Sequence, residues 1–562
     1  MRIISLYDKK LMTAITIVQK FPKSRWFAKD LDSFIRSQPA PNVCILYGVR
    51  RTGKTTAMLQ CIARLSDSEK AKVVFFQVRR PREKDGRVVS GDSLWDLKSD
   101  MEEFLEQGRG YFFVDEATNL LDFQEGAEVL SDVVALQGAK IVLSGTDSLC
   151  LDDARRDALL GRAITINTTS ISFSEWSLLT DHQDIDEFAR HGGILGDGNQ
   201  IQALFGNSDS CTEYVQSSYA RNMEHSISER KRSNVPESII ELAEERRFEG
   251  AVQRVVEDLS HRVTLRALRR ELSLSVIGSL RDLAAKDMRK SVAKPSQSAE
   301  GVMNRGRAME SIDEQQLIQW MALCLRIRDE RELQRGRTVD GYLPLSETVV
   351  GYLHCELARL HVLTPFPVLR VQHNGKVFTE SRNLLVQHGL KYCQAMTMAE
   401  CLVRDPAFVA LSNIDQGILL ERLKSDVLGH VLEEIVLLEV QNSIKRKNKN
   451  LFACTLGLPS GEIDFVVHDM SKKNLSLFEI KHSPNFDSEN QAKHLRDEEK
   501  LKLVCSTFPY SVIVRRTILL DNQMLKPFVD NAGISCMDIG MFLRFLDCNP
   551  YSVIFDDVSS FL

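Results

Sequence analysis

The sequence is poor in the residues that interrupt helices. Its 562 residues include 30 glycines and 15 prolines, fewer than the background of about 12% for the two together would give. No run of about eighteen apolar residues occurs, so we expect no membrane-spanning helix. Asp8, Lys9 and Lys10 stand where a signal peptide needs its apolar stretch. The composition therefore favours a helix-rich cytoplasmic protein with no membrane partner.

Paired cysteines and an excess of one charge are also absent. The twelve cysteines are scattered singly from Cys44 to Cys548, with no C-x-x-C pair, which indicates reduced thiols in small core positions. The 72 basic and 77 acidic residues give a net charge of −5. A chain that is basic throughout is excluded, but a local nucleic-acid groove is not.

The ordinary composition and the length together predict several globular domains. The chain is 43% hydrophobic and 27% charged, which excludes long disorder as its main state. At about 100–200 residues per domain, the length predicts three or four cores.

The first part of the chain has the pattern of a parallel α/β sheet. We expect residues 1–40 to be a helical lead-in and residues 41–205 to form one domain. Short apolar runs at 43–47, 73–78, 111–114 and 141–143 alternate with amphipathic stretches. Buried parallel strands covered by helices on both faces have this pattern.

The rest of the chain is predicted to contain three further regions. Residues 206–310 have helical periodicity and end in a polar connection, Ala284 to Gly306. Residues 311–400 show the order helix, helix, hairpin of a winged helix, with Asn374-Gly375 as the hairpin turn and Ser346 as a helix cap. Residues 420–562 combine a long helix with strands at 462–468, 475–481 and 510–514.

One segment of the first domain has the pattern of a phosphate-binding loop. The residues GVRRTGKT, Gly48 to Thr55, follow an apolar strand and open a helix, the context that a P-loop requires. Gly48 and Gly53 let backbone N–H groups wrap phosphates, Lys54 reaches the β- and γ-phosphates, and the Thr55 hydroxyl binds Mg²⁺. Thr52 and Thr56 complete the predicted ATP-binding loop. Arg51, like Arg50, either contacts phosphate or is exposed to solvent. We favour the solvent-exposed alternative for both arginines.

Acidic and hydroxyl side chains follow the next two predicted strands. Asp115 ends an apolar strand and is expected to hold the Mg²⁺, with Glu116 beside it to deprotonate the attacking water. Ser144, with Thr146 as the second choice, is placed to sense the γ-phosphate. Arg162, after a helix that carries two arginines, is our candidate for an arginine finger, with a merely solvated arginine as the alternative.

These segments, in this order and spacing, carry a resemblance. GVRRTGKTT, YFFVDE, IVLSGT, LLGRAITI and SISFSEW resemble the predicted AAA+ ATPases of bacteria and archaea. The resemblance implies an ATPase domain, a helical or winged-helix region, and a C-terminal domain of uncharacterised role. It supports Arg162 as the finger, acting within its own chain or on a neighbouring one. The order S-G-T differs from the T-G-S usual in that family, which leaves the sensor between Ser144 and Thr146.

A second group of charged residues follows from strand pairing near the C-terminus. A symmetric hairpin about the turn DMSKKN pairs Asp464 with Glu479 and Glu462 with Lys481. Strand alternation places these four side chains on one face and Ile463, Phe465, Phe478 and Ile480 on the other. Two facing carboxylates repel each other unless a cation lies between them. The hairpin therefore predicts a divalent-metal site.

This group is similar to the core of restriction-endonuclease-like phosphodiesterases. The similarity implies that Asp464 and Glu479 bind Mg²⁺ or Mn²⁺ and that Lys481 activates water. Glu433, on the preceding helix, supplies a third carboxylate. An ordinary solvent-facing hairpin is the alternative for these charges, as is a domain that keeps the residues but only binds.

We therefore expect an α/β protein with a P-loop NTPase domain, a helical and winged-helix middle, and a C-terminal restriction-endonuclease-like domain. The expected activity is hydrolysis of ATP with Mg²⁺, coupled to a nuclease-like domain that acts on DNA or RNA. The alternative is a nucleotide-dependent switch whose C-terminal domain binds a protein or other partner without cleaving it. Assembly into a homo-oligomer is left open. Lys445, Arg446, Lys447 and Lys449 would suit a polyanion, although a solvated loop is the more common reading.

Overall fold

A computed structural model gives the fold of most of the chain. It describes residues 2–5, 9–37, 43–79, 82–84, 87–147, 149–151, 154, 162–196, 198–229, 235–271, 345–403, 413–447, 450–483, 491–522 and 525–556. The predicted polar connection and the start of the segment 311–400, with the first helix expected there, lie outside these residues. Within them, no helix combines the length and the apolar character needed to cross a membrane.

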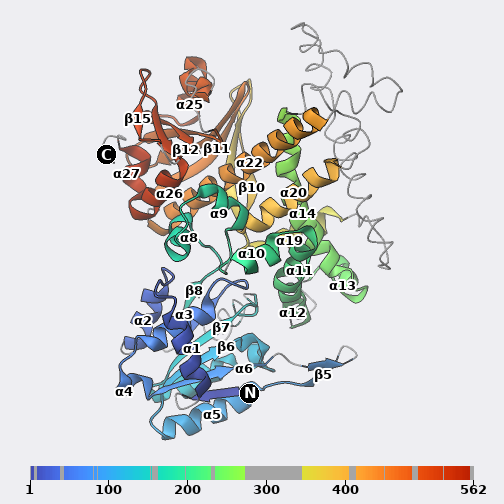
Figure 1. Cartoon of the computed structure of the whole chain (residues 1–562), viewed down its shortest axis with the longest axis vertical. Coiled ribbons are helices and arrows are strands. Elements are labelled where there is room, and N and C mark those ends of the chain that lie inside the picture. Colours follow the sequence, from blue (N-terminus) through green and yellow to red (C-terminus); the bar gives the residue numbers. More distant parts are fainter. Residues whose placement is uncertain are drawn as a thin grey trace.

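The N-terminal sheet has five parallel strands and one antiparallel edge strand, in the order β1-β3-β6-β7-β2-β8. It lies at one end of the molecule in Figure 1. The four apolar runs predicted as strands are confirmed, whereas β8 and β1 were not predicted; β1 adds a strand to the expected helical lead-in. The strands are β1 (Arg2–Ser5), β2 (Val43–Tyr47), β3 (Val73–Gln77), β6 (Tyr111–Asp115), β7 (Lys140–Gly145) and β8 (Ala163–Asn167).

Helices cover both faces of this sheet, as the continuous burial of its strands requires. One core joins the sheet to α1 (Lys9–Gln19), α2 (Ala28–Arg36) and α3 (Lys54–Ala63). The other joins it to α5 (Leu94–Glu106) and α6 (Phe123–Val129). A short helix α4 (Asp67–Lys70) and a small hairpin, β4 (Arg82–Lys84) with β5 (Arg87–Ser90), complete this part. The arrangement is the α/β fold of a P-loop NTPase.

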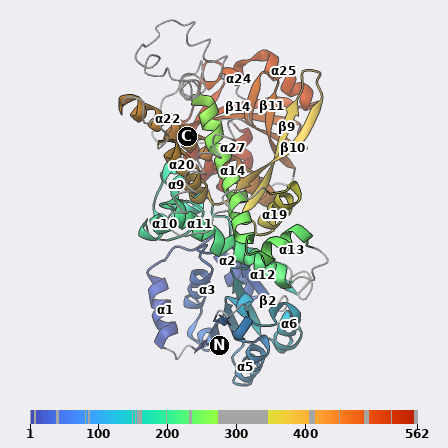
Figure 2. The ribbon, with the colours of Figure 1, turned by 90° about the vertical axis from the view of Figure 1, so that its right-hand side faces the viewer.

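A helical region lies between the two ends of the molecule (Figure 1). Its core includes Val49 of the phosphate-binding loop and Leu363 and Leu385 of the C-terminal sheet, so it contacts both ends. Figure 2 shows α14 running along the long axis, where it packs against α20 and α22. The helices are α8 (Phe173–Thr180), α9 (Ile185–His191), α10 (Gly198–Phe205), α11 (Ser208–Val215), α12 (Arg221–Glu229), α13 (Glu237–Glu244), α14 (Phe248–Glu271) and α19 (Glu347–Arg359).

The C-terminal sheet has eight strands in the order β10-β9-β11-β12-β13-β14-β16-β15. One face packs against α8, α9, α20 (His388–Val403), α22 (Asn413–Lys447), α26 (Ile539–Cys548) and α27 (Pro550–Phe555). The other face packs against α24 (Lys493–Arg496) and α25 (Glu498–Thr507). The strands are β9 (Leu363–Val371), β10 (Val377–Leu385), β11 (Leu451–Leu458), β12 (Gly461–Asp469), β13 (Asn474–Lys481), β14 (Val512–Leu520), β15 (Phe528–Val529) and β16 (Ser535–Asp538).

The hairpin expected in a separate winged helix belongs to this C-terminal sheet. Ser346 caps α19 as predicted, because its side chain accepts the Val349 N–H, and β9 pairs with β10 around a turn in which Gly375 has φ +76°. However, β9 also pairs in parallel with β11. The expectation of an independent unit over 311–400 is corrected here, since these strands complete a sheet whose other members lie beyond residue 450.

The predicted register of the β12–β13 hairpin is confirmed where the strands pair. Phe465 lies opposite Phe478, and the same register continues to Asp469 and Asn474. The pairing of β12 with β11 is irregular between Cys454 and Leu456, where two residues of β12 lie opposite one of β11. Ile463 therefore joins the core on the face opposite to Phe465, and the predicted alternation fails at that residue.

Candidate functional site

The phosphate-binding loop begins where β2 ends, and α3 begins at Lys54 within it. Gly48 has φ +152°, and a Cβ there would lie 2.4 Å from Thr168 Oγ1. Gly53 has φ +84°, a conformation that strains other residues. Both positions therefore require glycine to bring the backbone into this tight loop. The Thr52 hydroxyl is buried and forms hydrogen bonds with Val49 O and Thr168 Oγ1. The backbone N–H of Thr52 is therefore the group that this residue offers to a ligand.

Lys54 is buried at the floor of the loop. Its Nζ donates to Gly48 O at 2.7 Å and to Val49 O at 2.9 Å. Burial lowers the pKa of Lys54 to about 8, although Glu116 and Asp115 act in the opposite direction. The two acids thus help to keep a desolvated ammonium charged beside the loop.

The predicted magnesium ligands lie next to each other. Thr55 Oγ1 donates to Asp115, 3.1 Å from Oδ1 and 3.0 Å from Oδ2. Ser144 Oγ donates to Asp115 Oδ1 at 2.5 Å. Three side chains from α3, β6 and β7 therefore converge, as the ends of neighbouring parallel strands allow. A hydroxyl and a carboxylate are oxygen ligands of the kind that Mg²⁺ takes, so these residues fit the ion.

Glu116 follows Asp115 in a left-handed conformation, with φ 58° and ψ 44°. A non-glycine residue in this region is strained, by about 1–3 kcal/mol, and here the turn directs the carboxylate away from the strand. Its Oε2 accepts the Thr146 Oγ1 hydroxyl at 3.1 Å. The two candidates for the γ-phosphate sensor therefore contact different carboxylates. Ser144 contacts Asp115, and Thr146 contacts Glu116.

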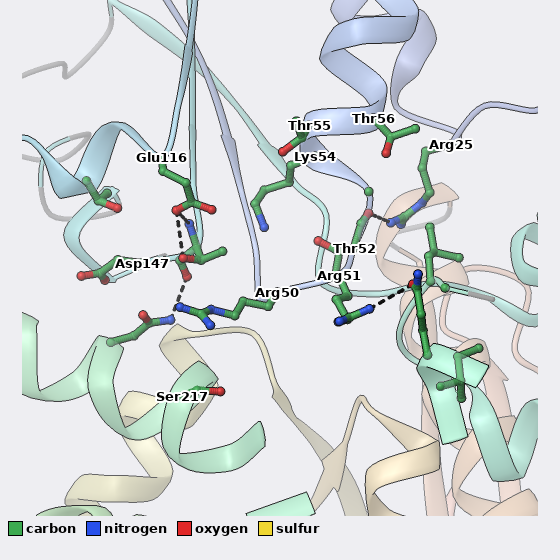
Figure 3. A pocket seen from close by; sticks show the side chains of 18 of the residues that line it. Arg25, Arg50, Arg51, Thr52, Lys54, Thr55, Thr56, Glu116, Asp147 and Ser217 are labelled. Atoms are coloured by element: carbon green, nitrogen blue, oxygen red, sulfur yellow. Dashed lines mark hydrogen bonds between the residues drawn. The ribbon is translucent and has the colours of Figure 1, made fainter. Parts of the chain in front are cut away.

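A cavity of about 2520 Å³ opens in front of these groups. Figure 3 shows Lys54, Glu116 and Arg50 around one space, with Thr55 and Thr56 at the start of α3. Asn222 of α12 donates to Thr146 O at 2.8 Å, so the helical region closes one side. Arg51 also lines the cavity, but its guanidinium donates to Gln200 at 3.1 Å and its carbonyl accepts the Leu195 N–H. Its interactions thus tie the loop to the helical region.

Arg25 is a site residue that the sequence did not reveal. Its guanidinium is buried and donates to Glu175 Oε1 at 2.6 Å, to Thr52 O at 2.5 Å and to Ser170 O at 2.8 Å. Arg25 therefore fixes the backbone of the phosphate-binding loop at Thr52. Glu175 belongs to the SISFSEW segment, but no spacing rule links it to Arg25, 150 residues earlier.

Arg162 lies away from the cavity of its own chain. It precedes β8, whose first residue, Ala163, pairs with Val43 at the start of β2. The phosphate-binding loop follows the other end of β2. This strand has five residues, so its two ends lie about 16 Å apart at 3.3 Å per residue. Its guanidinium is half exposed and pairs with Asp132 at 2.6 Å. In this arrangement Arg162 lies at the opposite end of β2 from the phosphate-binding loop and does not line the cavity.

The C-terminal acidic residues form a cluster that has a lysine at its centre. Lys481 Nζ lies 2.5 Å from Glu479 Oε2 and 3.4 Å from Asp464 Oδ2, while Asp464 Oδ2 also accepts the Ile480 N–H. Burial and then the Asp464 charge raise the pKa of Glu479 to about 8. Burial likewise raises the pKa of Asp464. Glu479 Oε1 is buried with no hydrogen-bond partner among the described residues, so it could accept a cation.

Glu433 is held by a different set of charges. Arg382 binds Glu433 Oε1 at 2.9 Å and Glu434 Oε1 at 2.5 Å, and His430 lies 3.3 Å from Glu433. Glu433, Asp464 and Glu479 do not form a group of metal-ligand spacing in the described part of the chain. The expected three-carboxylate site is therefore not assembled in this conformation, in which Glu433 pairs with Arg382.

The basic run at the end of α22 makes contacts with another helix of the protein. Arg446 pairs with Asp547 at 3.2 Å, and Lys447 donates to the Asp547 and Cys548 carbonyls. These contacts fix the end of α22 against α26. Arg446 and Lys447 are exposed, as a solvated basic run would be, but they lie in the last turn of α22 rather than in a loop.

Comparison with known proteins identifies the domain that carries the phosphate-binding loop. Residues 40–177 match the family model described as an AAA domain. Solved structures that match include C. elegans PCH-2, with 17% identity over 34% of this chain and 49% of that chain (TM-score 0.19), and the S. cerevisiae Hsp104-ADP complex, with 11% identity over 92% and 73% (TM-score 0.25). The chain spans about half the length of the PCH-2 chain. No curated protein matches the sequence. The chain thus contains an AAA domain, which supports an ATP-binding ATPase.

Proposed function

We propose that this chain is a magnesium-dependent ATPase whose nucleotide state is coupled to its C-terminal domain. The contact of Thr55 with Asp115, together with Thr55 and Glu116 in the lining of the cavity, carries the first part of the proposal. Mg²⁺, held by Thr55 and Asp115, would neutralise charge on the phosphates of ATP. Backbone N–H groups of the loop and Lys54 bind the phosphates, and Glu116 orients and deprotonates the attacking water.

Replacement of Glu116 tests the hydrolysis step. Glu116→Gln keeps the size and the Thr146 contact but removes the base, so turnover should fall about 100-fold or more while ATP binding is retained. Lys54→Ala should remove binding itself. Glu106→Gln, an exposed acid on α5, is the matched control and should leave both unchanged. ATP turnover by Glu116→Gln at the wild-type rate would overturn the assigned base.

A chain of buried contacts supports the coupling. Arg25 joins the phosphate-binding loop to Glu175 on α8. The N–H of Phe173, at the start of α8, donates to Glu439 Oε1 of α22 at 2.7 Å. The same helix carries Glu433 and Glu434 beside the C-terminal sheet. A shift of the loop can therefore reach α22 through two direct steps.

For the C-terminal domain we propose a nuclease-like site built on Asp464, Glu479 and Lys481. Two carboxylates and a lysine at one strand end are the groups that metal-assisted phosphodiester cleavage uses, and the unpartnered Glu479 Oε1 fits a cation. One observation favours the alternative, a binding module that does not cleave. Lys481 itself bridges the carboxylates, and its ammonium already supplies the positive charge there.

A cleavage assay separates these two functions. The protein is incubated with Mg²⁺ or Mn²⁺ and with DNA and RNA substrates, with and without ATP. The nuclease predicts cleavage that Asp464→Ala and Lys481→Ala each abolish. Cleavage that survives both changes would exclude this site, and no cleavage under any condition would favour the switch.

A further inference from the structure

A histidine beside the nuclease-like cluster joins two halves of the molecule. His482 directly follows β13, and its Nε2 lies 3.1 Å from Asp521 Oδ2, just beyond β14, and 3.8 Å from Asp186 Oδ1 on α9. One ligand atom from each residue lies within 4.8 Å of the others, and in the described part of the chain no other such group of three occurs. The sequence offered no spacing that links these residues.

The surroundings of the three side chains have the features of a ligand set. Asp186 Oδ1 is buried and has no hydrogen-bond partner among the described residues. The second nitrogen of His482, Nδ1, lies 3.1 Å from Ser425 Oγ on α22, the outer contact that orients a metal-binding imidazole. Gly429 lies against the ring, because a Cβ there would be 3.0 Å from His482 Cβ. Thus α9, α22 and the ends of β13 and β14 all position this group.

Without an ion, the three side chains leave one buried oxygen unsatisfied. His482 Nε2 lies 3.1 Å from Asp521 Oδ2 but 3.8 Å from Asp186 Oδ1, so Asp186 Oδ1 stays beyond hydrogen-bond distance. Arg190 also faces Asp186 from the same helix, 3.9 Å from its Oδ2. A divalent ion can bind all three ligands.

We propose that Asp186, His482 and Asp521 bind a divalent transition-metal ion of the Zn²⁺ class. One imidazole nitrogen and two carboxylate oxygens suit this class better than Mg²⁺ or Ca²⁺, which prefer oxygen ligands alone. The inference is independent of the proposed ATPase and nuclease activities, since none of the three residues belongs to either site.

The ion would connect the nucleotide cavity with the C-terminal sheet. Glu187 and His191, on the same helix as Asp186, line the cavity. Beyond that helix, the Leu195 N–H donates to the carbonyl of Arg51 in the phosphate-binding loop. Metal bound at one end of α9 would therefore restrain a segment that contacts the loop at the other end.

Titration with Co²⁺ tests the site, because Co²⁺ bound to nitrogen and oxygen ligands absorbs visible light. We expect the full chain without nucleotide to develop this absorption as Co²⁺ binds, and Zn²⁺ to displace the ion. His482→Gln and Asp521→Asn should each weaken binding at least 100-fold, and Ser425→Ala about 10-fold to 100-fold. His430→Gln, at a half-buried histidine that also faces a carboxylate, is the matched control and should bind as the wild type does.

Thermal unfolding gives a second readout that does not depend on any one variant folding well. Zn²⁺ should raise the Tm of the wild type and of His430→Gln, but not that of Asp521→Asn. Two results would overturn the proposal. One is a wild type that shows neither the Co²⁺ spectrum nor a Zn²⁺-dependent Tm. The other is binding that persists in both His482→Gln and Asp521→Asn, which would place the metal elsewhere.

Discussion

Residues of the nucleotide site differ in how far the sequence predicts them. Lys54, Thr55, Asp115 and Glu116 could be predicted because a phosphate-binding loop and a strand end are local patterns with fixed chemistry. Arg25 could not, since its partners lie 27 to 150 residues away in the chain. Buried ion pairs depend on tertiary packing, which leaves no periodic signal in the sequence.

Loss of Arg25 is expected to destabilise the protein strongly. Arg25→Met leaves the Glu175 carboxylate buried without its cation, which should lower the free energy of unfolding by about 3–5 kcal/mol. Urea denaturation measures the loss. Arg64→Met is the matched control, because Arg64 pairs with Asp32 at a half-exposed site, and its loss should be below about 1 kcal/mol. Equal losses for the two variants would contradict a special role for Arg25.

Strands and hairpins were predicted best where a single local sequence pattern specifies them. Four of the five parallel strands of the first sheet and the hairpin at Asn374-Gly375 follow from apolar runs and turn residues. The pairing of that hairpin with β11 does not follow from a local pattern, because β9 and β11 are about eighty residues apart in the chain. The irregular pairing at Thr455 also has no sequence signal, and it moved Ile463 to the other face.

The contact of α8 with α22 should give the protein a pH-dependent stability. Burial raises the pKa of Glu439 to about 8 from the ordinary value of 4.5. Between these values the folded chain keeps a proton that the unfolded chain has released, so stability falls as pH rises, by on the order of 1.4 kcal/mol per unit. Glu479, whose pKa is also raised to about 8, adds a slope of the same sign. Glu439→Gln, which still accepts the Phe173 N–H, should therefore reduce the slope by this amount in unfolding experiments from pH 5 to 8. Glu421→Gln, exposed on the same helix, should retain it; a slope unchanged by Glu439→Gln would refute the assignment.

A glycine fixes how α9 and α20 approach each other. Gly193 has φ +94°, and a Cβ there would lie 2.7 Å from Gln387 Cα. Gly193→Ala should therefore destabilise the protein by about 1–3 kcal/mol. Gly351→Ala, in α19 with open space around it, should instead stabilise it by up to about 1 kcal/mol. Chemical denaturation compares the two, and effects of the same sign would contradict the packing at Gly193.

The whole molecule places an AAA domain and a mixed C-terminal sheet at opposite ends of a helical region. The sequence predicts the two ends through their motifs, but the middle only through its helical periodicity. The position of Arg162 on the far edge of the first sheet has a consequence at this scale. If Arg162 contributes to catalysis, it does so for the nucleotide of a neighbouring chain.

Mixing two inactive variants tests this. Lys54→Ala lacks the phosphate-binding lysine, and Arg162→Ala lacks the finger, so each alone should have less than about a hundredth of the wild-type turnover. In a mixed oligomer the first variant can supply Arg162 to the intact loop of the second, and part of the ATP turnover should return. No recovery, in a mixture shown to contain mixed oligomers, would exclude Arg162 as a trans-acting residue.

Strand β9 pairs with β11, which is synthesised much later, and this order affects how the chain folds during synthesis. The β9–β10 hairpin can form as soon as residue 385 has left the ribosome, but its inner edge meets β11 only when residues 451–458 have emerged. At about 5–20 residues per second this edge stays unpaired for roughly 3–15 s. An open strand edge is a site for intermolecular pairing. Nascent chains stalled between residues 385 and 450 should therefore bind chaperones or aggregate more than chains stalled after residue 480.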